Sequence, residues 1–255
     1  MTVEGLLPVK KLIASPVTAL PFNVQVATIL SWASRHESKV VCAANVHMLT
    51  EAYKNTEFAS VLENADLVTP DGMPLVWMIR LMGVGNQNRV AGPDVFCTLC
   101  ELAPLQNIRI FFLGSKKEIL AQMRERLEGE FPNLQIAGME PLPFCPLTQA
   151  EDEAIIQKIH ASKAGLVFVA LGCPKQEYWM ARHKGKIQAV MIGVGAAFSM
   201  YAGIHKRAPR WLQQTGLEWL YRLCQEPRRL WSRYWNSNLT FIWLALKQLL
   251  VERYN

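Results

Sequence analysis

One carboxylate in the sequence is placed to act as a general base. Asp71 lies in the turn Pro70-Asp71-Gly72, which follows the apolar run 65–68. A carboxylate at the end of a buried strand is where a base must lie to take a proton from a bound substrate. Asp before Gly is also common turn chemistry, and Asp71 can equally cap the helix expected from residue 73. The residues alone leave both roles open.

Two glycine-containing segments are suited to binding a phosphate. Residues 172–177 (GCPKQE) and 193–198 (GVGAAF) each follow an apolar run. Each brings backbone N–H groups to the start of an expected helix, a favourable position for an anion. Neither segment matches GxGxxG or the Walker pattern GxxxxGK(S/T), so they favour a nucleoside diphosphate over a dinucleotide or ATP.

Arginines of the C-terminal segment form a third candidate group. Arg222, Arg229 and Arg233 are 7 and 11 positions apart, counted from Arg222, and such spacing returns to one face of a helix, although Pro227 bends the chain between them. Three convergent guanidinium groups suit a pyrophosphate. A solvated basic face that meets anionic lipid without specificity explains the same spacing equally well.

The sequence does not predict a metal site or a cofactor. No Asp-x-Asp follows an expected strand, the five His residues are isolated from one another, and the one Cys-x-x-Cys, Cys97 to Cys100, has no second pair. The acidic run 151–153 is better explained as negative charge in the first turn of a helix.

The elements that must position these residues alternate along the chain. Short apolar runs typical of buried strands are separated by stretches with helical spacing. The runs are 40–44, 65–68, 108–113, 134–137, 166–171 and 189–194, and the helical stretches include 73–82, 95–103, 116–130 and 151–162. Thr148 and Glu151 form a capping box before the last stretch. This alternation predicts an α/β fold with a mainly parallel, Rossmann-like sheet and helices on both faces. Ligands should bind beyond the carboxyl ends of its strands.

Charge is distributed unevenly along the chain. Nine of the 27 Lys and Arg residues but only three of the 21 acidic residues follow Ala202, so the net charge of +6 lies in residues 203–255, with five of the eight Trp residues. We predict a catalytic α/β body over 1–202 and a basic, Trp-rich helical appendage over 203–255. Because Lys and Arg pair with lipid phosphates and Trp prefers the hydrocarbon–water boundary, this composition favours a membrane surface over a helical dimer interface or a nucleic acid.

The expected membrane association is peripheral. The most apolar stretch of the appendage, 239–246, is stopped by Lys247 and falls short of the roughly 18 to 20 apolar residues that cross a bilayer. Acidic and basic residues interrupt the first 16 positions, which therefore do not resemble a signal peptide. The six scattered Cys residues are expected to be reduced thiols. These features predict a protein on the cytoplasmic face of the membrane.

Several segments, taken in order, resemble the WecG/TagA/CpsF family of bacterial glycosyltransferases. The set spans residues 40 to 233 and is specific as a set, although no single element would be. It comprises Asn45, PDG at 70–72, RVAGPD at 89–94, ALGCPKQE at 170–177, GVGAAF at 193–198, RAP at 207–209 and GLEWLYRL with EPRR between 216 and 229.

The resemblance implies an inverting, metal-independent transfer of a sugar from a UDP-sugar to a polyprenyl-diphosphate-linked sugar in cell-surface polysaccharide synthesis. It makes Asp71 the general base, Gln176 a sugar contact, and Arg222 and Arg229 ligands of the lipid diphosphate. UDP would lie across segments 172–177 and 193–198. The other candidate substrate-binding residues are Asn45, Asp94, Gly172, Lys175, Glu177, Gly193, Gly195, Arg207 and Arg233.

Two features depart from the family pattern. Some members place Thr two residues before the Asn, where this chain has Ala43, and the chain continues past the EPRR region with residues 239–255. Two other classes of function stay open at this point. One is a non-catalytic nucleotide-binding adaptor of a membrane assembly complex, and the other is a nucleotide-dependent oxidoreductase on a similar sheet. The donor sugar, the acceptor and a homo-oligomeric state are not specified by the sequence.

Overall fold

The computed structural model describes residues 7–143 and 147–254. Six strands form the main sheet in the order β4-β3-β8-β7-β5-β6, and two more form a separate hairpin. The main strands are β3 (Lys39–Ala44), β4 (Leu67–Pro70), β5 (Ile110–Gly114), β6 (Ile136–Glu140), β7 (Leu166–Ala170) and β8 (Val190–Gly193). All six apolar runs are therefore strands, and the expected α/β class with a mainly parallel sheet is confirmed.

The chain divides into two compact units. The first, called the sheet unit here, comprises residues 23–42 and 92–205. The second, called the tail unit, comprises residues 1–22, 43–91 and 206–255. The C-terminal segment thus belongs to the same compact unit as the Pro70-Asp71-Gly72 turn. The expected division into a body over 1–202 and an appendage over 203–255 stays a prediction.

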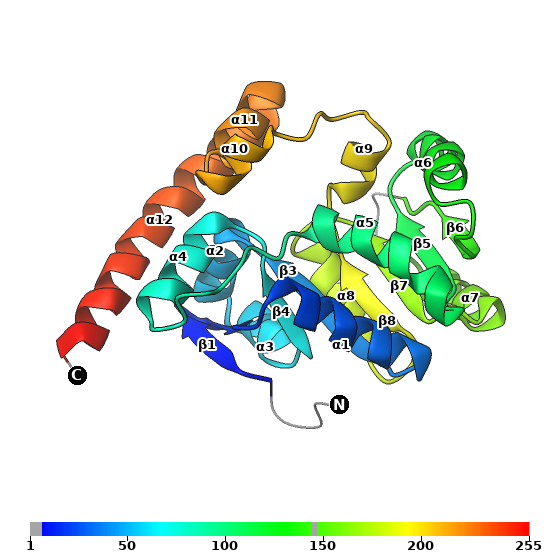
Figure 1. Cartoon of the computed structure of the whole chain (residues 1–255), viewed down its shortest axis with the longest axis horizontal. Helices are drawn as coiled ribbons and strands as arrows, with labels where there is room; N and C mark the ends of the chain where they lie inside the picture. The colour runs from blue at the N-terminus through cyan, green and yellow to red at the C-terminus, as the bar shows by residue number, and fades with distance from the viewer. Residues whose placement is uncertain (1–6, 144–146, 255) are drawn as a thin grey trace. The chain divides into compact units, whose positions relative to one another are not determined.

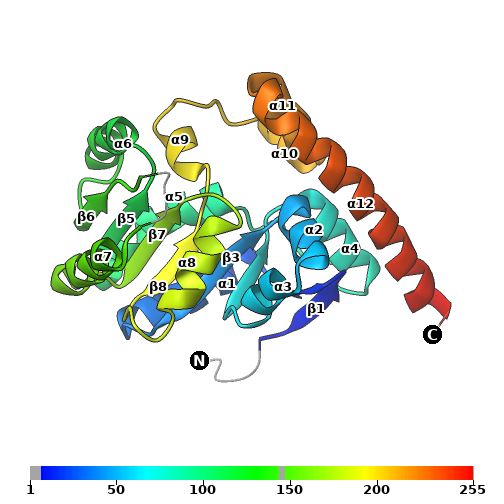
Figure 2. The same cartoon turned by 180° about the vertical axis from the view of Figure 1, so that it is seen from behind.

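In the sheet unit, strands β3, β8, β7, β5 and β6 pair in parallel. Helices α1 (Phe22–Ser34) and α5 (Gly92–Leu102) cover one face, and α7 (Gln149–Ser162) and α8 (Lys175–His183) cover the other (Figures 1 and 2). The remaining helices are η1 (Ala103–Gln106), α6 (Lys117–Glu130) and α9 (Ala197–Tyr201). The capping box of Thr148 and Glu151 at the start of α7 is confirmed.

Aromatic side chains fill the core of the sheet unit. The ring of Phe96 on α5 lies 5.0 Å from that of Phe168 on β7 and 5.9 Å from that of Phe112 on β5, measured between centroids. Phe198 and Tyr201 of α9 pack on the same ring. Because these large side chains are buried together, they hold the strand ends and the start of α9 in a fixed arrangement.

The tail unit combines a hairpin with helices from both ends of the chain. Its elements are β1 (Val9–Leu12), β2 (Ser15–Thr18), α2 (Val46–Lys54), α3 (Thr56–Glu63), β4, α4 (Met73–Leu81), α10 (Arg210–Gln214), α11 (Glu218–Gln225) and α12 (Pro227–Tyr254). Pro227 is the first residue of α12, where proline is tolerated, so it separates two helices instead of bending one. Arg222 therefore lies on α11, whereas Arg229 and Arg233 lie on α12.

The long helix α12 packs along α2 and α4 of the tail unit (Figures 1 and 2). Its inner face buries Leu230, Phe241 and Leu244. Polar contacts fix it as well: Ser237 Oγ lies 3.2 Å from His47 Nδ1 of α2, and the Gln248 amide accepts from Ile13 N and donates to Lys11 O, both at 2.7 Å. None of the helices in the described part of the chain is long and apolar enough to span a bilayer.

Candidate active site

Asp71 lies immediately beyond the carboxyl end of β4 in the tail unit. Its backbone N–H donates to Ala44 O at 2.8 Å, which joins the turn to the end of β3. Asn45, the first residue after β3, is the N-cap of α2 and accepts from Met48 N through Oδ1. A Cβ added to Gly72 would lie 3.8 Å from the Asn45 Cβ. The predicted neighbours Asn45 and Asp71 are therefore brought together, and Gly72, not Asp71, is the N-cap of α4.

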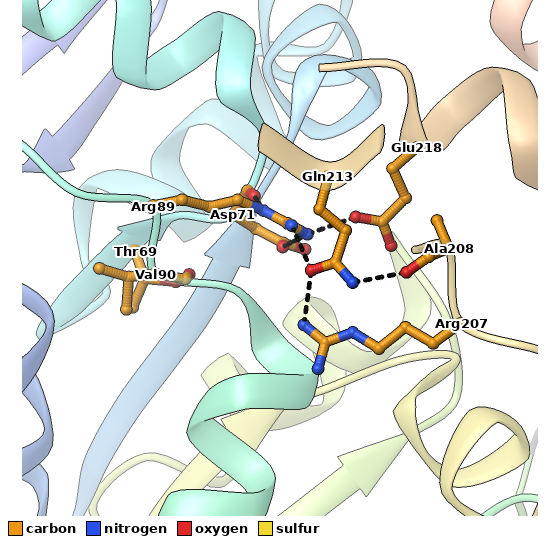
Figure 3. A network of polar contacts seen from close by, with 8 residues as sticks. All are labelled: Thr69, Asp71, Arg89, Val90, Arg207, Ala208, Gln213 and Glu218. Atoms are coloured by element: carbon orange, nitrogen blue, oxygen red, sulfur yellow. Dashed lines mark hydrogen bonds and ion pairs between the residues drawn. The ribbon is translucent and has the colours of Figure 1, made fainter. Parts of the chain in front are cut away.

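Arg89 is held directly over the Asp71 turn. The adjoining residue Val90 donates its N–H to Pro70 O and accepts from Thr69 Oγ1, both at 3.0 Å, so segment 89–90 is fixed to β4. Arg89 Nε donates to the main-chain oxygen of Asp71, and Nη2 lies 3.4 Å from Asp71 Oδ1 (Figure 3). Only 15% of the Arg89 side chain and 21% of the Asp71 side chain are exposed, so this ion pair is largely shielded from water.

The C-terminal segment of the tail unit supplies the other partners of Arg89. Glu218 at the start of α11 accepts from Arg89 Nη2 at 2.6 Å. Gln213 of α10 accepts from Arg89 Nη1 at 3.2 Å and from Arg207 Nη2 at 3.1 Å through the same Oε1 atom. Its Nε2 donates to Ala208 O at 2.7 Å (Figure 3). The predicted residues Asp71 and Arg207 thus belong to one polar network, which Arg89 and Gln213 connect.

The electrostatic environment makes Asp71 a stronger base than an ordinary aspartate. Burial raises the pKa of Asp71 to about 6, Arg89 and Arg222 act in the opposite direction, and Glu218 raises it further. A carboxyl with a pKa near the working pH can be ionised and still accept a proton effectively. The raised pKa agrees with the general-base role expected for Asp71, which stays a prediction.

The three arginines predicted to converge do share one neighbour. Tyr234 of α12 is partly buried and its ring packs edge-on against Trp219 of α11, with centroids 5.8 Å apart. Burial raises the pKa of the Tyr234 hydroxyl, whereas the positive charges of Arg222, Arg233 and Arg229 all oppose that rise. Each guanidinium is thus close enough to influence the same phenol. Arg222 lies on α11 and the other two arginines lie on α12, so they do not share one helical face, and their convergence on a ligand stays a prediction.

In the sheet unit, Gln176 joins the two glycine-containing turns. Its Oε1 accepts from Gly172 N at 3.2 Å and from Gly195 N at 3.1 Å. A Cβ on Gly193 would lie 2.8 Å from Gln176 Nε2, so a larger residue here would displace the Gln176 amide. Gln176 is only 4% exposed. The Gln176 amide oxygen is therefore occupied by hydrogen bonds that hold the two turns together. The expected sugar contact by Gln176 stays a prediction.

Glu177 is the buried end of this network. Its Oε1 accepts from Gln176 Nε2 at 2.7 Å, and its Oε2 has no hydrogen-bond partner among the described residues. Burial raises the pKa of Glu177 to about 7, against smaller effects of hydrogen bonds from Gln176, the backbone and Cys173. Lys175 is exposed at the first position of α8, and Asp94 is partly exposed in the first turn of α5.

The acidic run at the start of α7 has structural partners. Glu151 belongs to the capping box, and Asp152 accepts from Trp179 Nε1 at 2.9 Å while its other oxygen lies 2.9 Å from His183 Nε2. His183 is buried and its ring stacks on that of Trp179. Within residues 7–143 and 147–254, no three His, Cys, Asp or Glu side chains are grouped so as to hold a metal ion.

Sequence reasoning assigned no role to Arg89, Gln213 or Glu218. Two of them lie inside segments that had been noted, Arg89 in RVAGPD and Glu218 in GLEWLYRL. The charges of Arg89 and Glu218 within these segments were the feature that could have marked them as candidates. Helices α10 and α11 contact the 89–90 segment, from which they are separated by more than a hundred residues of chain. This contact connects Gln213 and Glu218 to Asp71, and residue spacing in the sequence does not predict it.

Comparison with known proteins gives one family and a consistent set of relatives. Residues 10–255 match the model of the "Glycosyl transferase WecG/TagA/CpsF family". A protein of Bacillus spizizenii named "N-acetylglucosaminyldiphosphoundecaprenol N-acetyl-beta-D-mannosaminyltransferase" is 34% identical over 204 residues, which is 80% of this chain and 77% of that protein. A protein of the same name from Bacillus subtilis is 35% identical over 196 residues, 76% of this chain and 74% of its own length.

Proposed function

Because the chain belongs to the WecG/TagA/CpsF family of glycosyltransferases, we propose that it moves a sugar from a UDP-sugar to a sugar carried on a polyprenyl diphosphate, with inversion and without a metal ion. The two Bacillus relatives are named as N-acetylmannosaminyl transferases that act on N-acetylglucosaminyl-diphosphoundecaprenol. We extend both substrates to this chain. Family membership removes the adaptor and oxidoreductase alternatives, since the protein is a glycosyltransferase.

The observation that carries the mechanism is the enclosed Asp71 carboxylate at the end of β4, with part of its side chain still exposed. Asp71 takes the proton from the acceptor sugar hydroxyl as that oxygen attacks the anomeric carbon of the donor. The new C–O bond forms as the bond between the anomeric carbon and the UDP phosphate oxygen breaks, and UDP leaves with the bonding electrons. Attack from the opposite side inverts the anomeric centre.

Fixed protein charge is proposed to stabilise the departing diphosphate. Segments 172–177 and 193–198 include the first residues of α8 and α9, and Gln176 holds the two turns in place. Backbone N–H groups at such helix starts favour an anion. We assign Gly172, Lys175, Gly193 and Gly195 to this donor site. The N–H groups of Gly172 and Gly195 donate to Gln176, so these glycines shape the turns and leave other N–H groups of the helix starts to face the diphosphate. Gln176 and Glu177 support the site, and Asp94 is a further candidate contact.

The lipid diphosphate of the acceptor is assigned to the arginines around Tyr234. Arg222, Arg229 and Arg233 all act on that phenol, and guanidinium groups recognise phosphate oxygens through paired hydrogen bonds. Arg222 also acts on Asp71. The residues that bind the diphosphate and the residue that deprotonates the acceptor sugar are therefore electrostatically linked through α11.

A membrane-peripheral location on the cytoplasmic side is proposed from the outer face of α12. Trp231 and Trp235 are each 60% exposed and stack on each other, and Leu239, Ile242 and Leu246 continue the same exposed apolar face. Basic residues at the start of the helix add attraction to anionic headgroups. An amphipathic helix of this kind lies in the membrane interface and places the arginines near a lipid-linked acceptor.

The test is a transfer assay on the purified full-length chain. UDP-N-acetylmannosamine, UDP-N-acetylglucosamine and UDP-glucose are offered with a short-chain lipid diphosphate bearing N-acetylglucosamine, and UDP release and product mass are measured. We expect transfer from UDP-N-acetylmannosamine and a β-linked product. Transfer from another donor alone would overturn the proposed substrate, and a product of retained configuration would overturn the one-step mechanism.

A further inference from the structure

The contacts of Arg89 raise a chemical problem for the proposed base. A guanidinium beside a carboxylate stabilises the ionised form and lowers its affinity for a proton. Arg89 Nη2 faces Asp71 Oδ1, and Arg89 Nε is bound to the main chain of the same residue. With no competing acceptor, this shielded arginine would pair closely with Asp71 and weaken it as a base.

Glu218 is that competing acceptor. It lies 2.6 Å from Arg89 Nη2, the same nitrogen that is 3.4 Å from Asp71. The shorter contact is a full charge-assisted hydrogen bond, whereas the longer one is at the limit of hydrogen bonding. Glu218 is only 17% exposed, so its charge acts at short range with little screening by water. The guanidinium is thus drawn toward α11 and away from the Asp71 carboxylate.

Docking of the C-terminal helices determines whether Glu218 can reach Arg89. Gly216, between α10 and α11, adopts φ +72°, and a Cβ there would lie 2.6 Å from Trp77 of α4. Glycine at this position lets the α10–α11 turn rest directly on α4. Gln213 then binds Arg89 from α10 and Glu218 binds it from α11. Two consecutive helices therefore act on one guanidinium.

We propose that Glu218 is a positioning residue that holds the Arg89 guanidinium away from the Asp71 carboxylate, so that Asp71 is an effective base when α11 is docked. The inference rests on the proposed function, in which Asp71 deprotonates the acceptor. The charged groups that act on Asp71 are Arg89, from the segment after α4, and Glu218 and Arg222, both from α11. Loss of the Glu218 charge leaves two cations and no anion beside Asp71.

The experiment is a titration of Asp71 in full-length protein labelled with ¹³C at Asp carboxyl groups, with Asp71→Asn identifying the signal. In Glu218→Gln, which keeps the side-chain size, we expect Asp71 to titrate about 1 pH unit lower than in the wild type. The acidic limb of kcat/KM should move by the same amount, and turnover above that limb should fall roughly 3-fold to 10-fold because the base is weaker. Glu218→Asp, which retracts the charge, should give a smaller shift in the same direction.

Glu226→Gln is the matched control, since it removes another carboxylate of the C-terminal segment, one paired with Arg229, that does not act on Asp71. Asp71 should titrate there as in the wild type. An unchanged Asp71 titration in both Glu218 variants would overturn the inference, because a purely structural role would not move that signal. If Asp71→Asn is inactive in that case, the proposed base stands and only the role of Glu218 fails. Full activity of Asp71→Asn would overturn the base assignment and the inference together.

Discussion

The guanidinium of Arg89 contacts Asp71 twice, through Nε at the main-chain oxygen and through Nη2 at Oδ1. The first contact fixes the turn after β4, and the second places a positive charge beside the proposed base. Arg89 thus orients the turn, which favours catalysis, and lowers the proton affinity of the Asp71 carboxylate, which opposes it. Other charged groups around Asp71 therefore affect its strength as a base. They also determine how activity should depend on pH.

Activity should require the ionised form of Asp71. The pKa of Asp71 is raised to about 6, so the carboxyl is protonated below that pH and cannot act as a base. We expect kcat/KM to fall on the acidic side with a midpoint near pH 6, and Asp71→Asn to lower turnover by on the order of 100-fold with UDP affinity nearly unchanged. UDP release as a function of pH and calorimetric UDP titration measure the two quantities. Asp66→Asn, one residue before β4, is the control and should keep wild-type turnover. Undiminished turnover of Asp71→Asn would show that Asp71 is not the general base.

The arginines around Tyr234 should matter even without a membrane. We expect Arg222→Glu or Arg229→Glu to reduce turnover with a soluble, short-chain acceptor by about 10-fold or more, because a carboxylate would repel the acceptor diphosphate. Arg228→Glu makes the same change of charge at an exposed neighbouring position and serves as the control. Normal turnover in solution combined with failure on membranes would show that Arg222 and Arg229 only attract lipid.

The exposed aromatic face of α12 should control membrane recruitment separately from chemistry. Replacing Trp231 and Trp235 with Gln removes the two stacked rings that are 60% exposed. We expect co-sedimentation with anionic liposomes to weaken by about 10-fold or more, since binding grows with the apolar area removed from water, by about 25 cal/mol per Å². Turnover with the soluble acceptor should be retained. Unaltered liposome binding would argue for another occupant of this face.

Glu177 should make folding stability depend on pH. Its pKa is raised from 4.5 to about 7, so the folded protein retains a proton that the unfolded chain loses. Between pH 4.5 and about pH 7 the free energy of unfolding falls as pH rises, and below pH 4.5 the ionisation of Glu177 no longer lowers it. We expect Glu177→Gln to be more stable than the wild type by on the order of 1 to 3 kcal/mol near pH 8, with the difference vanishing near pH 4. Urea unfolding at both pH values tests this, with exposed Glu153→Gln as the control.

Transfer should continue in excess EDTA. The proposed charge for the leaving diphosphate comes from backbone N–H groups at the starts of α8 and α9 and from arginines, none of which a chelator removes. We expect turnover within about 2-fold of the untreated enzyme, a change that corresponds to less than roughly 0.5 kcal/mol in the barrier. Loss of activity that magnesium or manganese restores would contradict the metal-independent mechanism.

Local patterns in the sequence determined the class of fold and the location of Asp71. The six apolar runs are six strands, because strands of a parallel sheet covered on both faces read as short continuous apolar segments. The Thr148 and Glu151 capping box marked a helix start correctly because capping depends on neighbours three residues apart. The motif set was likewise sufficient to identify the family, which residues 10–255 match.

Only the tertiary structure determined which charges surround Asp71, the proposed base. Arg89, Gln213 and Glu218 come from separate segments, and their contacts depend on the packing of α10 and α11 on α4, where Gly216 meets Trp77. Burial, which raises the pKa of Asp71, is likewise a property of the folded chain. The structure likewise revealed that Gln176 connects Gly172 with Gly195. Such long-range contacts arise from packing between elements, whereas sequence patterns report on periodicity and neighbours within one element.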